Sequence, residues 1–267
     1  LARDRAAAAG VTLDLREAGL PGGGLEAGRY GFVLVPQDVF LHLEDGEVQR
    51  AALTEAGFVE RLVTFWSNHF CVSANKGEPA RIWAGAFERE AIRPHVLGRL
   101  RDMLLAAARH PAMLVYLDQA QSIGPNSPAG QRRQRGLNEN LAREYLELFT
   151  LGHGNYTEAD VTAAARALTG FTLQRDGGTA VARLRPRRHD SGQKTLLGRS
   201  GDLGADDVVD LALAQPASST FVISRLWARF VSHEPPPAAH LERLTTAYGP
   251  ERRLDRLLLA LVAGPGF

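Results

Sequence analysis

The sequence predicts a mainly α-helical fold, an irregular multi-helix domain with one small β-hairpin near residues 171–186. Apolar residues recur at the 3.6-residue helical spacing over most of the chain. Two short β-prone runs within residues 171–186 flank the turn sequence "DGG", which is typical of a hairpin. Because helical pattern of the same type resumes after the loops, we expect residues 1–267 to form a single helical domain. The chain begins and ends inside such patterns, which suggests an excerpt of a longer protein.

The first half of the chain contains three helical segments. Residues 52–70 place their aromatic and branched apolar side chains on one side of the repeat. A second helix is expected near residues 95–109, and it is interrupted before Pro111 because proline cannot continue a helix. The third covers residues 137–150 and ends around Gly152.

Capping residues mark the next helix. Thr157 is followed three positions later by Asp160, a capping-box arrangement with Asp in place of Glu, and Gly170 is a natural stop. The loop at residues 122–136 has linker composition, and we expect a mobile surface loop there. Four further helices are expected at residues 205–214, 217–231, 237–247 and 251–263.

The composition is that of an ordinary globular protein and argues against several classes of function. A net charge of +1 over 267 residues gives no general attraction to nucleic acid or to an anionic membrane. The longest apolar run, residues 257–264, is far shorter than the roughly 20 residues that span a bilayer, and no signal peptide is visible. Cys71 is the only cysteine, so a metal site would need His, Asp or Glu ligands. The GxSxG, HExxH, P-loop and CxxC signatures are absent.

His69 is the first candidate for a functional role. At about 100° per residue, it falls in the middle of the apolar arc with Leu62 and Trp66. A buried histidine needs a partner for each ring nitrogen. Two interpretations stay open, a core histidine bonded to a backbone carbonyl and a functional group. Asn68 lies on the other side of the helix and is a weaker candidate.

Glu144 is the second candidate, on a helix that is otherwise apolar enough for a core. The expected core face of this helix consists of Leu141, Tyr145, Leu148 and Phe149. Glu144 lies between Leu148 and Leu151 on the helical wheel, so it should be partly buried. Burying a carboxylate without a partner costs several kcal/mol, so a cation, a metal or a proton must compensate it. We therefore favour a role in a site for Glu144.

The other charges on this helix have a simpler explanation. Glu139 and Glu147 each lie four residues from Arg143, and such pairs stabilise surface helices by roughly 0.2–0.5 kcal/mol. Asn140 shares one strip of the helix with Glu144 and Glu147. Glu139 and Glu147 are thus explained as partners of Arg143.

His189 and Asp190 form the third candidate group, on a loop that follows the hairpin and contains Gly192. Loops held by rigid elements often carry binding groups, although adjacent residues need not point the same way. Asp118 is expected to make turn hydrogen bonds at a helix end. The remaining charges expected to be simply solvated are Arg185, Arg187, Arg188 and the cluster "RRQR" at residues 132–135.

These candidates lead to one spatial expectation. His69, Glu144 and the His189–Asp190 loop should converge on a single polar pocket, with Arg143 or Asn140 at its border.

The chain also resembles a large bacterial family catalogued as domain of unknown function 1800. The matching segments, in the family's order, are "FWSNHF" (65–70), "HPAMLVYLDQAQSIGPNS" (110–127), "LNENLAREYLELFTLGHGNYTEADVTAAARALTG" (137–170), "HDSGQKTLLG" (189–198) and "LWARFVSHEPPP" (226–237). The resemblance implies a mostly helical domain, often exported through an N-terminal signal and often encoded beside a second exported protein. This chain lacks that signal and stops before the family's C-terminal portion. Some members carry His where this chain has Phe149, so no ligand role is carried over to that position.

The family motifs point to a set of polar residues that overlaps the set chosen from burial. The set is Asn68, His69, Asn138, Glu139, Asn140, Arg143, Glu144, Glu147, His189 and Asp190.

Two classes of function follow as hypotheses. The first is a metal-dependent or acid–base hydrolase of the cell envelope, and the alternative is an exported, non-catalytic binding or assembly module that acts with the co-encoded protein. Neither involves nucleic acid, and the resemblance implies a periplasmic or other extracytoplasmic location. In the enzyme, one divalent metal with N and O ligands would be held by His69 and Glu144. The catalytic residues would be Glu144, His189 and Asp190, and the substrate-binding residues Asn68, Asn138, Asn140 and Arg143.

Overall fold

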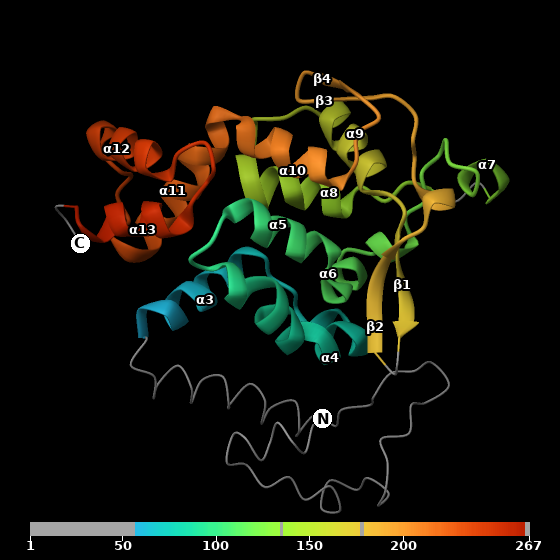
Figure 1. Ribbon diagram of the computed structural model, residues 1–267, viewed down its shortest axis with the longest axis horizontal. Coiled ribbons are helices and arrows are strands. Elements are labelled where there is room, and N and C mark those ends of the chain that lie inside the picture. The colour runs from blue at the N-terminus through green and yellow to red at the C-terminus, as the bar shows by residue number, and fades with distance from the viewer. Residues whose placement is uncertain (1–56, 134–135, 177–178, 265–267) are drawn as a thin grey trace, which may run out of the picture.

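The computed structural model describes residues 57–133, 136–176 and 179–264, most of which are helical (Figure 1). The α-helices are α3 (Gly57–His69), α4 (Glu78–Phe87), α5 (Leu100–Arg109), α6 (Pro111–Tyr116), α7 (Gly130–Arg133), α8 (Asn140–Glu144), α9 (Glu158–Leu168), α10 (Ala205–Ala214), α11 (Pro216–Phe230), α12 (Ala238–Tyr248) and α13 (Leu254–Val262). Shorter helical turns are η1 (Ala74–Lys76), η2 (Glu88–Ile92), η3 (Arg93–His95), η4 (Gln119–Gln121), η5 (Tyr145–Leu151) and η6 (Pro186–Arg188). The predicted mainly α class is confirmed. The single-domain prediction stays a prediction, because it includes residues outside the described part.

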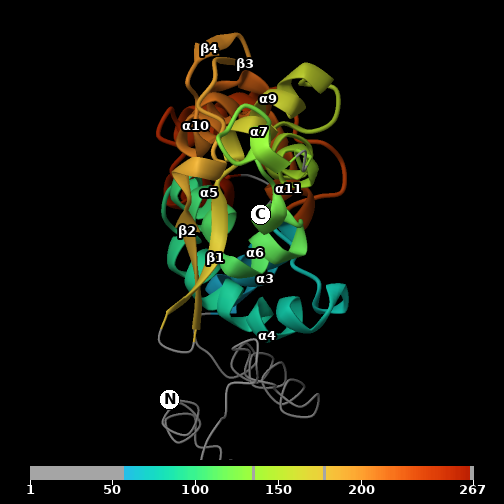
Figure 2. The ribbon, with the colours of Figure 1, turned by 90° about the vertical axis from the view of Figure 1, so that its right-hand side faces the viewer.

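The helices pack around one continuous cluster of buried apolar side chains. Helices α5 and α6 lie in the middle, with α3 and α4 on one side and α8, α9 and α10 on the other (Figure 1). In Figure 1, helices α11, α12 and α13 lie at one end of the described part and a β-hairpin runs along the opposite end; Figure 2 views that end, with the hairpin in front. Trp66, Phe70 and Tyr145 are fully buried at the centre, where the Tyr145 hydroxyl donates to the Leu104 carbonyl.

Several predicted helices are observed close to their expected bounds. Helix α3 buries Leu62, Phe65 and Trp66 on one face, as its repeat predicts, although residues 52–56 lie outside the described part. The capping box at the start of α9 is confirmed, because Thr157 accepts from the Asp160 N–H at 3.2 Å while Asp160 accepts from the Thr157 N–H at 2.9 Å. Local patterns are thus enough to place these helices.

The predicted hairpin is present as strands β1 (Phe171–Asp176) and β2 (Thr179–Leu184), paired antiparallel from Phe171–Leu184 to Asp176–Thr179. A second small sheet, β3 (Lys194–Leu196) with β4 (Arg199–Gly201), lies where no strand was predicted. Strands of three residues are too short to display an alternating apolar pattern, so they could not be predicted from periodicity.

The helix expected at residues 137–150 differs from the prediction. It starts at Asn140, whose N–H is bound by the Asn138 side chain at 2.9 Å, and after Glu144 it widens into the π-helix η5. A π-helix changes the angular position of each later side chain. Leu148, predicted to lie on the core face, is therefore 47% exposed, while Phe149 remains buried.

The segment at residues 122–136 is more structured than its composition predicted, because it contains the short helix α7 and backbone hydrogen bonds to residues 187 and 188. None of the described helices combines the length and apolar character needed to cross a membrane.

Candidate functional site

A cavity of about 270 Å³ opens where η1, the end of α6 and helix α8 meet. It is lined by Lys76, Tyr116, Leu117, Asn140, Arg143 and Glu144. Three of the residues predicted for the site, namely Asn140, Arg143 and Glu144, thus lie together in this pocket, which we call the Glu144 pocket.

Glu144 is half-buried and makes no hydrogen bond or ion pair with any residue that the structure describes. Burial raises the pKa of its carboxyl group, and the nearby negative charge of Glu147 raises it further. The partial burial predicted for Glu144 is therefore observed, but no cation among the described residues compensates its charge. A raised pKa makes this carboxylate a stronger proton acceptor than an ordinary solvated one.

The two cations of the pocket are already paired with other carboxylates. Lys76 donates to Asp118 at 2.9 Å, and the Arg143 guanidinium donates to both oxygens of Glu158 at 2.9 and 2.8 Å. The predicted Arg143–Glu139 pair is present only at 3.9 Å. These pairs leave the charge of Glu144 uncompensated within the pocket.

Glu147 was predicted to pair with Arg143, and this prediction is wrong. Its carboxylate instead accepts a hydrogen bond from the Tyr156 hydroxyl. Burial and this contact raise the pKa of Tyr156 to about 12, so Tyr156 remains a donor at neutral pH. The other oxygen of Glu147 lies 3.7 Å from Nδ1 of the exposed His153, and the negative charge of Glu147 acts on Glu144.

Tyr116 is a neutral hydrogen-bond donor in the pocket lining. Burial raises the pKa of its hydroxyl, and the neighbouring Cys71 and Glu144 raise it further. Tyr116 is therefore protonated when Glu144 is ionised, which places a hydrogen-bond donor and a proton acceptor in one pocket.

His69 lies in a different environment, among aromatic rings of the core. It is 4% exposed, and its Nε2 donates to the Phe149 carbonyl at 3.1 Å. Burial, with a smaller effect of Arg225, lowers the pKa of His69 to about 3, so the ring is neutral. The observed geometry matches the interpretation as a core histidine bonded to a backbone carbonyl, although Nδ1 has no partner among the described residues.

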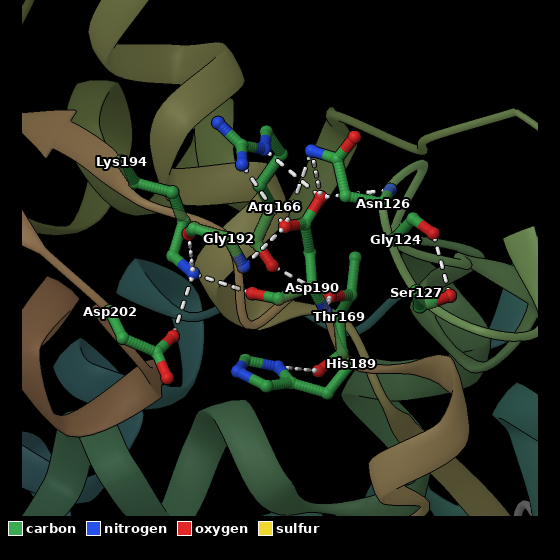
Figure 3. Close-up of polar contacts among 10 residues, drawn as sticks. All are labelled: Gly124, Asn126, Ser127, Arg166, Thr169, His189, Asp190, Gly192, Lys194 and Asp202. Atoms are coloured by element: carbon green, nitrogen blue, oxygen red, sulfur yellow. Dashed lines mark hydrogen bonds and ion pairs between the residues drawn. The ribbon is translucent and has the colours of Figure 1, made fainter. Parts of the chain in front are cut away.

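Asp190 forms the third environment, shown in Figure 3. Its side chain is fully buried, and its two oxygens accept from Arg166 Nε and Nη2 at 3.0 Å each. The Asn126 N–H at 3.3 Å, the Asn126 side-chain amide at 3.2 Å and the Gly192 N–H at 3.0 Å also donate to this carboxylate. We call this set of contacts the Asp190 network. Burial alone would raise the pKa of Asp190, but the hydrogen bonds from Arg166, Asn126 and Gly192 outweigh it and lower the pKa to about 2.

The neighbours of Asp190 fix its backbone as well. The Asp190 N–H donates to the Thr169 hydroxyl at 2.9 Å, and His189 Nδ1 donates to the Thr169 carbonyl at 2.9 Å. The buried Lys194 ammonium donates to the Gly192 carbonyl at 2.9 Å and to Asp202 at 3.2 Å. In Figure 3 the His189 ring lies on the opposite side of the chain from the Asp190 carboxylate, so the two side chains do not act on one point.

The expected convergence is therefore not observed. Neither His69 nor the His189–Asp190 loop lines the Glu144 pocket, because the Phe149 carbonyl holds His69 and Arg166 holds Asp190. Within the described part of the chain, no group of three or more His, Cys, Asp or Glu side chains is arranged to hold a metal ion.

The two remaining asparagines have modest roles. Asn68 is exposed, and Asn138 uses its side chain to cap α8 through the Asn140 N–H.

Sequence reasoning missed several residues that shape these environments. Lys76 and Tyr116 reach the pocket from segments that carried no chemical signature. Arg166, a single cation in the alanine-rich run "TAAARAL", was the one available signal for the partner of Asp190.

Comparison with known proteins gives a family but no relative of known function. The sequence profile described as "Protein of unknown function (DUF1800)" matches residues 28–267, which confirms the resemblance in motifs. No curated protein and no solved structure shows significant similarity to the chain. The function must therefore be argued from the geometry of the chain itself.

Replacing Asp190 by Asn should destabilise the protein strongly. The change leaves Arg166 without its counter-charge in a buried network, which costs about 3–5 kcal/mol of unfolding free energy. Urea unfolding at pH 7 measures the loss. Asp118→Asn is the matched control, because Asp118 pairs with Lys76 at 2.9 Å and both side chains are exposed (38% and 41%), so its loss should cost less than about 1 kcal/mol.

The cost of Asp190→Asn should also depend on pH. The folded-state pKa lies below the ordinary value of 3.8, so the carboxylate stabilises the fold above pH 4, and this stabilisation is lost as the pH falls towards 2. The depressed pKa corresponds to roughly 2 kcal/mol. A difference between wild type and Asp190→Asn that stays constant from pH 7 to pH 2 would contradict this account.

Glu144→Gln should have the opposite effect on stability. Since burial raises the pKa of Glu144, its ionised form weakens the fold above the ordinary pKa of 4.5, and a neutral amide removes that cost. The group is partly exposed to water, so the gain at pH 7 should be at most about 1 kcal/mol and should vanish below pH 4. A loss of about 3–5 kcal/mol in a thermal or urea melt would instead mean that Glu144 is the structural partner of a cation.

Proposed function

The chain belongs to the DUF1800 family of proteins of unknown function, and we propose that it is an acid–base hydrolase in which Glu144 transfers the proton. One observation carries the proposal. Glu144 is a half-buried carboxyl group with a raised pKa and no partner among the described residues, and it lines an open pocket. An unpaired carboxyl group with a raised pKa in a cleft is a candidate for catalysis, because keeping it unpaired costs stability.

The reaction that fits this pocket is hydrolysis of an ester or amide by a water molecule. Glu144 accepts a proton from the water as the water oxygen bonds to the acyl carbon. The same proton then passes from Glu144 to the leaving oxygen or nitrogen as its bond to that carbon breaks. Glu144 returns to its starting state, and no other reactant is consumed.

Other pocket residues supply binding and charge stabilisation. The Tyr116 hydroxyl, protonated because its pKa is raised, is a donor for the oxygen that becomes negative during the attack. Asn140 and Arg143 bind substrate from α8, and Glu158 holds the Arg143 guanidinium in place. Lys76 provides a further ammonium at the border of the pocket, where it is paired with Asp118.

The proposal takes the acid–base form and not the metal-dependent form. A ligand set of His69 and Glu144 does not fit, because the two side chains lie in separate environments and the Phe149 carbonyl occupies one nitrogen of His69. Asp190 is a positioning residue in this proposal, since its carboxylate is enclosed by Arg166 and backbone N–H groups. His189 likewise holds the loop in place, through its hydrogen bond to the Thr169 carbonyl.

We keep the extracytoplasmic location and the co-encoded partner as parts of the proposal. Both come from the resemblance of the motifs, and fractionation of cells that express the full-length protein tests the location.

Glu144→Gln should lower the turnover number of any hydrolysed substrate by about 100- to 10,000-fold, the usual contribution of general acid–base catalysis. The measurement is a screen of chromogenic esters, amides, glycosides and phosphate esters, followed by kinetics on whichever substrate is cleaved. Glu242→Gln is the matched control, because Glu242 is an exposed glutamate on α12 outside the pocket lining. Turnover that is equal in wild type and Glu144→Gln would refute the proposal, and so would a failure to cleave any class.

Glu147→Gln should shift the pH profile without abolishing turnover. Glu147 raises the pKa of Glu144, so removing its charge lowers that pKa. Since the base works when ionised, the acidic limb of kcat/KM should move to lower pH. Gln retains an oxygen that accepts from the Tyr156 hydroxyl, so the fold is preserved. An unmoved acidic limb would show that the group titrating in catalysis is not Glu144.

A further inference from the structure

Two basic segments that are about fifty residues apart in sequence lie side by side in the structure. Helix α7 carries Arg132, and the segment that leaves β2 and forms η6 carries Arg185 and Arg187. The Ala129 N–H donates to the Arg187 carbonyl at 2.9 Å, one residue before α7 begins. Figure 1 shows α7 beside the short turn above β2. From the sequence, these arginines were predicted to be separate, solvated charges, because their proximity depends on the fold.

The contact between the two segments is rigid. The Gly124 N–H donates to the Arg188 carbonyl at 2.9 Å, and the Arg188 guanidinium donates to the Ala120 and Ser122 carbonyls at 3.0 and 3.2 Å. A Cβ on Gly130 would come within 2.1 Å of the Gly124 carbonyl, so the chain approaches more closely than any other residue allows. With Arg188 anchored inward, its neighbours Arg187 and Arg185 are exposed.

These three arginines have no carboxylate partner among the described residues, unlike arginines such as Arg143 and Arg166. Arg132, Arg185 and Arg187 are exposed, and none forms an ion pair with a residue that the structure describes. Arg185 meets only the neutral side-chain oxygen of Gln174, at 3.4 Å. By contrast, Arg143 is bound by both oxygens of Glu158. Three positive charges without an ion-pair partner among the described residues form a local excess on this part of the surface, in a chain whose net charge is +1.

We propose that Arg132, Arg185 and Arg187 form a docking surface for an acidic peptide segment of a partner protein. Arginine forks match carboxylate oxygens in geometry and charge, and charge complementarity of this kind speeds association and selects partners. Leu184, 50% exposed next to Arg185, gives the surface an apolar contact that a peptide side chain can cover. None of the four residues offers an aromatic ring for stacking bases, which disfavours nucleic acid. The proposal does not depend on the Glu144 pocket.

The test is binding of a fluorescent peptide that alternates Glu and Leu, measured by anisotropy with the whole chain. Arg132→Glu combined with Arg187→Glu should weaken binding at least about tenfold, because each change replaces attraction by repulsion. Arg229→Glu combined with Arg256→Glu is the matched control, since both residues are exposed on other helices and the change in net charge is the same. The control should bind like wild type, and thermal melts of both variants should match wild type.

Three outcomes would overturn the proposal. The peptide fails to bind the wild-type chain, or the two double variants weaken binding equally, which would mean a general effect of net charge. Tighter binding of duplex DNA or of phosphatidylglycerol vesicles than of the peptide, lost in the same arginine variant, would assign the surface to another class of partner. If the arginine variant melts early, Arg132→Gln with Arg187→Gln replaces it, and unchanged peptide affinity in that variant refutes the proposal.

Discussion

The buried carboxylate of Asp190 binds three segments that lie far apart in the sequence: α9 through Arg166, the 122–130 segment through Asn126, and the turn before β3 through Gly192. A buried charge is tolerated only when a counter-charge and several N–H groups surround it. Gly124 permits the approach, since a Cβ there would lie 2.5 Å from that of Asp190. The same interaction therefore fixes the loop that brings α7 to η6.

The pKa of Glu144 is raised and the pKa of Asp190 is lowered, although both carboxyl groups are buried to some extent. This contrast distinguishes a carboxylate that stabilises the fold from one that is available for chemistry. The hydrogen bonds of Arg166 and its neighbours more than offset the burial of Asp190, so its pKa falls to about 2 and the group is ionised at neutral pH. Burial of Glu144 meets no such compensation, so its pKa rises. Stabilisation of the fold explains the burial of Asp190. It does not explain the burial of Glu144, which is why the proposed chemistry rests on Glu144.

Much of the fold could be predicted from the sequence because its signals are local. The repeat in α3, the Thr157–Asp160 cap and the partial burial of Glu144 all depend on residues within a few turns. Leu148 was placed wrongly because an α-helical wheel does not apply to the π-helix that follows Glu144. The convergence of His69 and Asp190 on the Glu144 pocket failed for another reason: their partners, Phe149 and Arg166, are set by tertiary packing, which no spacing encodes.

Helix α9 connects the environments that the sequence argument had joined into one. At its start Glu158 holds the Arg143 guanidinium of the pocket, and towards its end Arg166 holds Asp190. Thr162, between them, donates to Glu139 at 2.8 Å and so ties the helix to the residue that precedes α8. Helix α9 thus positions Arg143 in the lining of the Glu144 pocket, and through Asp190 it positions the 122–130 segment that leads into α7. The motif residues thus lie in two separate environments, the Glu144 pocket and the Asp190 network, and α9 contacts both. This explains why residues of different roles occur in the same short stretches of sequence.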